Sequence, residues 1–162
     1  MTLPTDWQTR VDALWLRLDE TDPVAFVTAM QGLAAERGAN DPAALFEFAS
    51  ANDSVGNEAQ AEPLYRQALT AGLDGIDRRR ATIQLASTLR NLGQHDEALS
   101  LLQAEQRQAS DDLDDAVTAI LALVLADLGR EREALALTLT ALAPHLPRYT
   151  RSITNYAKAL MP

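Results

Sequence analysis

The feature that most constrains the fold of this chain is an internal repeat marked by glycine and alanine. Gly56, Gly93 and Gly129 stand 37 and 36 residues apart, and an alanine follows each of them five positions later. Periods between about 20 and 50 residues are typical of proteins that stack one supersecondary unit on the next. The repeat therefore predicts a series of similar units along the chain.

The residues around each glycine predict two antiparallel helices per unit. Glycine accepts the left-handed conformation at a helix C-terminus at no steric cost, so each glycine ends a first helix. The chain then reverses, and the small alanine lets a second helix approach the first closely. The supporting positions are Phe48, Leu85 and Leu121 before the glycines, Ala61, Ala98 and Ala134 after them, and then Tyr65, Leu102 and Thr138. We therefore expect an all-α fold.

Helices are also predicted on both sides of these units. Thr5 to Gln8 has a capping-box sequence, and Asp22-Pro23 begins a second helix that Gly38 ends. After Pro147 we expect an amphipathic helix whose apolar stripe contains four residues: Tyr149, Ile153, Tyr156 and Leu160. We predict seven to nine helices and no sheet in a single domain. It comprises a capping pair (1–40), three repeats (41–147) and a C-terminal helix (148–162).

Residues 41–147 resemble the tetratricopeptide repeat, which places large and small apolar residues at these offsets in two antiparallel helices. The usual tryptophan and first-helix tyrosine are replaced by Leu45 and Asn52 in the first repeat. The resemblance implies a short right-handed superhelix with capping helices, acting as a non-catalytic scaffold that binds a protein or peptide. The segments DPAALFEFASANDSVG and RRRATIQLASTLRNLGQHDEAL also resemble a small, mainly bacterial group of compact tetratricopeptide proteins of unassigned function, which implies a homodimer.

Composition and charge narrow the classes of function. The chain has no cysteine, no basic leader and no apolar run of membrane-spanning length, so we expect a cytoplasmic protein without a membrane partner. The net charge is −9, and residues 1–75 hold 12 acids against 4 bases. Three adjacent arginines on a helix, Arg78 to Arg80, point in different directions. We therefore expect no binding of nucleic acid.

Reactive residues do not form a catalytic or metal-binding motif. His95 and His145 each lie in a turn without a second histidine four residues on. The acidic run from Asp111 to Asp115 lacks the glycine and glutamate of an EF-hand, and it indicates a helix start that Ser110 caps. We predict no catalytic residue, no cofactor and no metal. The alternative to a scaffold is a purely structural, self-associating protein whose groove is closed by its own C-terminal helix, and the remote alternative is a small unrecognised enzyme.

The repeat frame predicts a partner-binding groove on the first helix of each unit. Its expected lining is Phe46, Glu47, Ser50, Arg80, Ile83, Gln84, Ser87, Arg90, Asn91, Ile120 and Leu123. The lysine, arginine and asparagine that grip a terminal carboxylate in some relatives are replaced by other residues, so we do not expect that clamp. At the clamp positions this chain has Phe46, Ser50, Gln84, Ala116 and Ile120.

Two questions remain open at the level of sequence. Arg80 and Arg90 either bind an acidic peptide or, as we favour, pair with carboxylates of the preceding repeat such as Glu47 or Asp53. The first helix of the third repeat is apolar around most of its circumference and requires a cover. That cover is the chain's own C-terminal helix, the same helix of a second copy, or a foreign helix, and the first two need no unseen partner.

Overall fold

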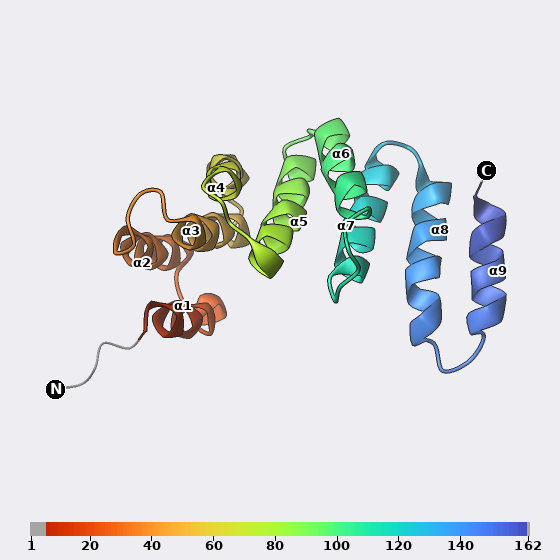
Figure 1. Ribbon diagram of the computed structural model, residues 1–162, viewed down its shortest axis with the longest axis horizontal. Helices are drawn as coiled ribbons and strands as arrows, with labels where there is room; N and C mark the ends of the chain where they lie inside the picture. The colour runs from red at the N-terminus through yellow and green to blue at the C-terminus, as the bar shows by residue number, and fades with distance from the viewer. Residues whose placement is uncertain (1–5, 162) are drawn as a thin grey trace. The chain divides into compact units, whose positions relative to one another are not determined.

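A computed structural model describes residues 6–161, which form nine α-helices, two 3₁₀ turns and no strand (Figure 1). In the first half of the chain these are α1 (Trp7–Trp15), η1 (Leu18–Glu20), α2 (Pro23–Ala35), α3 (Pro42–Ser54) and α4 (Glu58–Thr70). Next come α5 (Gly75–Asn91), α6 (His95–Glu105), α7 (Asp114–Asp127), α8 (Glu131–Leu142), η2 (Ala143–His145) and α9 (Thr150–Leu160). The prediction of an all-α fold is confirmed.

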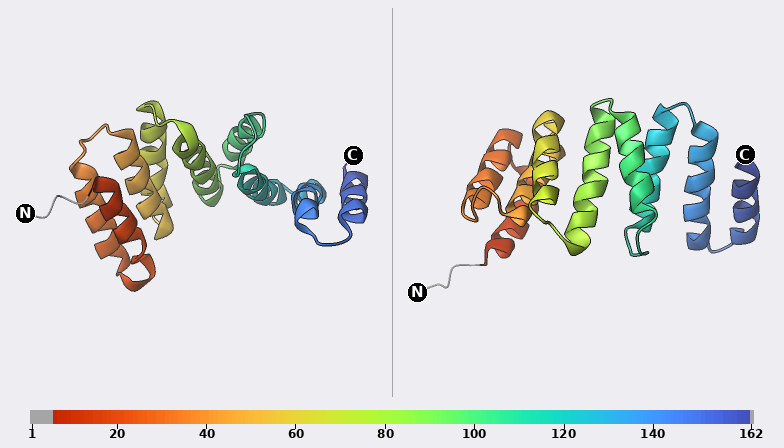
Figure 2. Two further views of the ribbon diagram at one scale, coloured as in Figure 1. Left: turned by 60° about the horizontal axis from the view of Figure 1, so that its bottom comes forward. Right: turned by 45° about the horizontal axis from the view of Figure 1, so that its top comes forward.

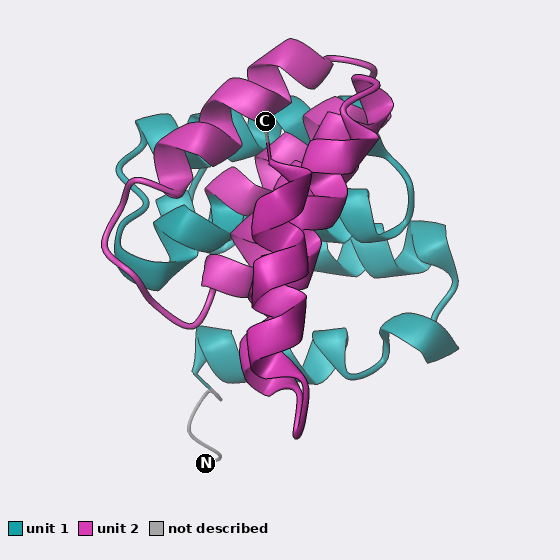
Figure 3. Cartoon of the chain, turned by 90° about the vertical axis from the view of Figure 1, so that its right-hand side faces the viewer, with its two compact units in different colours: residues 1–81 teal, residues 82–162 magenta. Residues whose placement is uncertain are grey.

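The chain divides into two compact units, and the boundary falls inside α5, after Ala81 (Figure 3). In the first unit α1 packs on α2, α2 on α3, and α3 on α4. In the second unit α6 packs on α7, α7 on α8, and α8 on α9. Packing of each helix on the next in sequence is the arrangement expected of stacked helix pairs.

Two helices begin with an aspartate cap, of which the sequence predicts the one at Asp22. The Asp22 carboxylate accepts hydrogen bonds from two amides of the first turn of α2, both at 3.0 Å. Asp41 accepts one at 2.9 Å at the start of α3, and a proline follows each aspartate. Thr5 of the predicted capping box lies outside the described residues, and Asp6, at the N-cap of α1, makes no side-chain capping bond.

The three repeat glycines end their helices in the left-handed conformation. Gly56, Gly93 and Gly129 have φ values of 82°, 77° and 73°. The amide of the residue after each glycine donates to the carbonyl oxygen five residues earlier, at 2.9, 2.8 and 2.8 Å. This is the Schellman pattern, which satisfies carbonyl groups that a helix end leaves unpaired. The alanines five residues on are all buried, as close helix approach requires: Ala61, Ala98 and Ala134.

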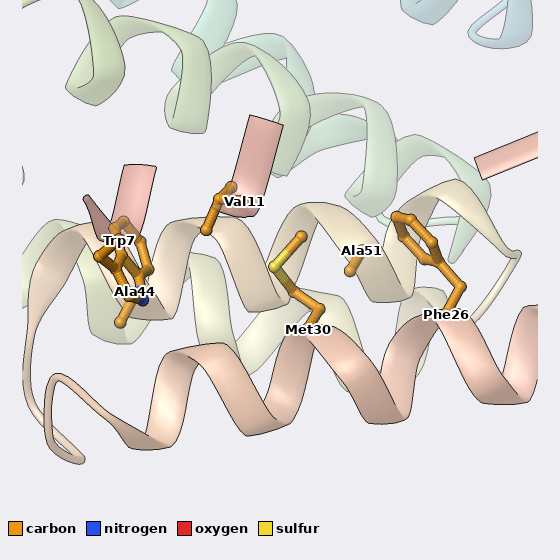
Figure 4. Packing of buried hydrophobic residues seen from close by; sticks show 6 residues of the cluster. All are labelled: Trp7, Val11, Phe26, Met30, Ala44 and Ala51. Carbon is orange, nitrogen blue, oxygen red and sulfur yellow. The ribbon is translucent and has the colours of Figure 1, made fainter. Parts of the chain in front are cut away.

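The core of the first unit joins the N-terminal helices to the first repeat. Its buried side chains come from α1, α2 and α3 (Figure 4): Trp7, Val11, Phe26, Met30, Ala44 and Ala51. The Trp7 indole N–H donates to the Leu33 carbonyl oxygen at 2.8 Å, so its polar atom is satisfied. The Trp15 ring meets Phe26 edge-on, with centroids 5.2 Å apart. The helix pair predicted to cap the N-terminal side thus shares a core with α3.

Helix α9 continues the second unit by packing against α8 and the η2 turn, and it lies beside α8 in each view (Figures 1 and 2). Ala157 is its buried residue. The Arg132 guanidinium of α8 donates to the carbonyl oxygens of Leu160 and Ala159, at 3.0 and 3.2 Å. A cation at a helix C-terminus satisfies free carbonyl groups and complements the helix dipole, so Arg132 fixes this end of α9 on α8.

The predicted apolar stripe of the C-terminal helix is correct in only two of its four residues. Ile153 and Leu160 are half-buried on the side of Ala157. Tyr149 precedes the helix with a φ of 71°, and Tyr156 is exposed. The packed face of α9 is therefore centred on the buried Ala157, and the two tyrosines do not belong to it.

Candidate interaction surface

One face of α7 is left partly uncovered by the rest of the second unit. Most of its apolar residues are buried, namely Val117, Leu121, Ala122, Val124 and Leu125. Ile120 is half-buried, Leu123 is 46% exposed and Asp127 is exposed. These three residues lie on one stripe because they are three and four positions apart. The cover by the chain's own C-terminal helix is not formed, since α9 packs on α8 instead.

An ion pair fixes the polar end of this face. Arg90 Nε lies 2.5 Å from Asp127 Oδ2, and Arg90 Nη2 donates to Asp127 Oδ1 at 3.3 Å. His95 Nδ1 lies 3.9 Å from the same Asp127 oxygen. The prediction that Arg90 pairs with the preceding repeat is wrong. Asp127 stands one repeat period after Arg90, and equivalent positions of successive first helices face each other.

These contacts define the α5–α7 surface of the second unit. It consists of Ser87, Arg90 and Asn91 from α5 and of Ile120, Leu123 and Asp127 from α7. The α5 side is polar, whereas the centre of the α7 side is apolar. Two other predicted groove residues of α5 are less accessible, since Ile83 is buried and Gln84 is half-buried.

The predicted groove residues of the first unit are largely part of its packing. Phe46 and Ser50 are buried, and their ring and hydroxyl contact Tyr65 of α4, with ring centroids 6.3 Å and hydroxyl oxygens 3.4 Å apart. The Arg80 guanidinium lies 5.4 Å from the centroid of the Phe46 ring, and its ion pair is with Asp77 at 3.1 Å. The predicted ion pair of Arg80 with Glu47 or Asp53 is therefore replaced by a pair within its own helix.

Glu47 and Asp53 serve contacts inside the first unit. Glu47 accepts a hydrogen bond from the Trp15 indole N–H at 2.6 Å, which joins α1 to α3. Burial raises the pKa of Glu47, although the Trp15 hydrogen bond and the charge of Arg80 act in the opposite direction. Asp53 accepts a hydrogen bond from the Tyr65 hydroxyl at 3.3 Å.

The acidic run before α7 organises a helix start. The Ser110 hydroxyl donates to Asp114 Oδ2 at 2.5 Å, and α7 begins at Asp114 with Leu113 at its N-cap. The predicted cap by Ser110 is wrong, because the helix begins three residues later than that cap requires. His145 Nε2 lies 2.8 Å from Asp115 Oδ2, which ties the η2 turn to α7.

Residues 6–161 also bear on two other classes of site, metal centres and membrane spans. Within this part of the chain, His, Cys, Asp and Glu side chains do not gather in any group of three or more that could hold a metal ion. Among the same residues, every helix is too short or too polar to cross a membrane. The neighbouring arginines do diverge, as predicted: Arg79 is buried and Arg80 is exposed.

Sequence reasoning missed an open groove on the first unit, formed by α2, α3, α4 and the turn between α2 and α3. It consists of two pockets of about 430 and 450 Å³ that share Leu45 and Gln67. Its apolar lining includes Ala34, Ala35, Ala44, Phe48 and Leu64. No sequence signal distinguishes these residues, because small alanines also mark ordinary helix packing.

Antiparallel helix pairs that end in left-handed glycines and pack on a buried alanine define a helical-repeat protein, a class that works through its surfaces. The family model described as "Tetratrico peptide repeat" matches residues 42–160. The chain therefore belongs to the tetratricopeptide repeat family, which confirms the resemblance seen in the sequence. No curated protein and no solved structure matches the chain.

Proposed function

We propose that this protein is a non-catalytic scaffold and that it binds a segment of another protein on the α5–α7 surface. The observation that carries the proposal is the exposure of Leu123 beside Ile120, on the face that each first helix presents. Full burial of a leucine side chain contributes about 1.5 to 3 kcal/mol, so covering the exposed half of Leu123 contributes about 1 kcal/mol.

The polar side of the surface restricts which partner segments fit. Arg90 and Asp127 hold each other in place, so their remaining hydrogen-bonding capacity is directed at fixed positions. Charged groups of this kind add specificity more than affinity. The partner we propose is an amphipathic segment whose apolar side chain packs on Ile120 and Leu123 while its polar groups meet Arg90 and Asp127.

The contacts of the two histidines support a scaffold over an enzyme. A catalytic histidine requires a nucleophile or substrate atom within hydrogen-bonding reach. His95 and His145 instead lie near Asp127 and Asp115, where they join helix ends. The chain also has no cysteine to act as a nucleophile.

Site-specific photocrosslinking in cells tests this proposal. A photoreactive phenylalanine analogue is placed at Leu123 in one experiment and at Leu135 in another, because Leu135 is a leucine of similar exposure (50%) on α8. We expect a discrete adduct with another protein at position 123 and none at position 135. The absence of an adduct at 123, or equal adducts at both positions, contradicts the proposal.

A second experiment measures the affinity for the captured segment by titration calorimetry. Loss of about 1 kcal/mol on Leu123→Ala corresponds to roughly fivefold weaker binding. Leu135→Ala is the matched control, and we expect it to leave the affinity unchanged. Equal effects of the two substitutions would show that the segment does not bind on this face.

A further inference from the structure

The two ends of the chain carry opposite charge. Residues 134–162 contain no aspartate or glutamate, but they contain three bases: Arg148, Arg151 and Lys158. Residues 12–24 have the reverse balance, with Arg17 as the one base among four acids: Asp12, Asp19, Glu20 and Asp22. Segregation of this kind produces fields of opposite sign at the two termini.

The C-terminal end presents a basic and aromatic face, which we call the C-terminal face. Its exposed residues are Tyr149, Arg151, Ser152, Asn155, Tyr156 and Lys158. Because Ala157 is the buried residue of α9, its neighbours Tyr156 and Lys158 flank opposite sides of the outward surface. The two tyrosines are 74% and 66% exposed, which leaves large rings in solvent beside the basic groups.

The backbone at Tyr149 supports a role for this face in binding. Among residues 6–161, Tyr149 is the one residue other than glycine that has a positive φ. A left-handed conformation is strained for a bulky residue, and such strain clusters at functional positions. No packing gain for the ring offsets this cost, because the Tyr149 side chain is mostly exposed.

The N-terminal end presents an apolar and acidic counterpart around the turn between α1 and α2, which we call the N-terminal turn. Leu16 and Val24 are 86% and 75% exposed. Asp19 and Glu20, which lie between them in sequence, are also exposed. Exposed apolar side chains with a charged rim are typical of an interaction site.

We propose that the C-terminal face of one copy of this chain docks on the N-terminal turn of a second copy. In this contact Tyr149 and Tyr156 cover Leu16 and Val24, while Arg151 and Lys158 face Asp19 and Glu20. The second copy is the occupant because the chain itself supplies a patch of opposite charge and matching apolar character. The contact joins two different surfaces, so it is heterologous: the first copy retains an unused N-terminal turn and the second an unused C-terminal face.

This contact uses none of the residues of the α5–α7 surface, so the two proposals fail separately. Light scattering and sedimentation velocity on the full chain measure the association. We expect the mass to rise with protein concentration at about 0.02 M sodium chloride and to return toward the monomer at about 0.5 M, where exposed charges are screened.

Charge reversal tests which surfaces meet. We expect the R151E/K158E and D19K/E20K variants to associate at least about tenfold more weakly than the wild type, because each brings like charges together. An equimolar mixture of the two variants restores opposite charge at both kinds of contact, so association should return. Circular dichroism and thermal melting establish that each variant is folded.

Single substitutions with the same change of net charge provide matched controls. Arg107→Glu is compared with Arg151→Glu, and Asp112→Lys with Asp19→Lys, since all four residues are exposed. We expect the control variants to associate like the wild type. The proposal would be overturned if the wild type stays monomeric at low salt, if the charge-reversal variants associate normally, or if their mixture fails to associate. A basic face that binds only a foreign acidic protein would give the first of these results.

Discussion

Replacement of Gly93 by alanine isolates the energetic role of the glycine that ends α5. Gly93 has a φ of 77°, and its amide donates to the Arg90 carbonyl oxygen at 3.0 Å. A methyl group added there meets no atom within 4 Å, so no steric clash with neighbours contributes. The cost is the left-handed backbone alone, about 1 to 2 kcal/mol for a residue with a Cβ. We expect Gly93→Ala to lower the free energy of unfolding by this amount.

Gly32 supplies a control of opposite sign. It lies inside α2, and a methyl group added to it also meets no atom within 4 Å. An alanine in a helix interior is more stable than a glycine by about 0.5 to 1 kcal/mol, chiefly because the unfolded chain loses freedom. The substitutions Gly93→Ala and Gly32→Ala are chemically identical, yet their effects should differ by about 1.5 to 3 kcal/mol.

Urea unfolding followed by circular dichroism measures the difference. Repeat proteins do not always unfold in a single step, so free energies are compared only where the dependence on denaturant is unchanged from the wild type. A neutral or stabilising Gly93→Ala would refute the left-handed assignment of the turn. A Gly32→Ala that destabilises as much as Gly93→Ala would show that the sign of φ does not determine the cost.

Three further predictions concern buried and paired side chains. Burial raises the pKa of Glu47, so the folded protein favours the protonated carboxyl group. The stability that this protonated group contributes is present at low pH and is lost as the pH rises through that pKa. Glu47→Gln, which retains an acceptor for the Trp15 indole, should therefore raise Tm near neutral pH, and this gain should disappear in acid when melts are compared across pH. Ala61→Leu should destabilise the first unit by about 1 to 3 kcal/mol in urea unfolding, because α4 has no space for a larger side chain there. A double-mutant cycle on Arg90 and Asp127 should give a coupling below about 1 kcal/mol that weakens with salt, since both side chains are partly exposed.

Sequence reasoning identified the elements wherever their signals are local. The positive φ at Gly93 and the capping bonds of Asp22 involve groups within five residues along the chain, so the residue type alone indicates the backbone. The buried Ala61 follows from the same repeat frame, because a close approach of two helices excludes a larger side chain. These features sufficed to predict an all-α tetratricopeptide fold.

The candidate site was less predictable, because it depends on which flank of a helix its neighbours cover. Phe46 and Ser50 have the spacing of groove residues, but Tyr65 of the next helix encloses them. Arg90 finds its partner one repeat later, at Asp127. Neither the burial of Phe46 and Ser50 nor the ion pair of Arg90 can be read from the few residues on either side of them in the sequence.

The sequence by itself determined where the chain reverses at the repeat glycines and where α2 begins, since hydrogen bonds and backbone sterics over short distances control those events. Tertiary structure alone decided that Leu123 and Tyr156 remain exposed and that Arg132 holds the end of α9. The physical reason is that burial and ion pairing depend on the rotation and stacking of helices about one another. Those quantities are set by all packed side chains together, so a single helix pattern does not contain them.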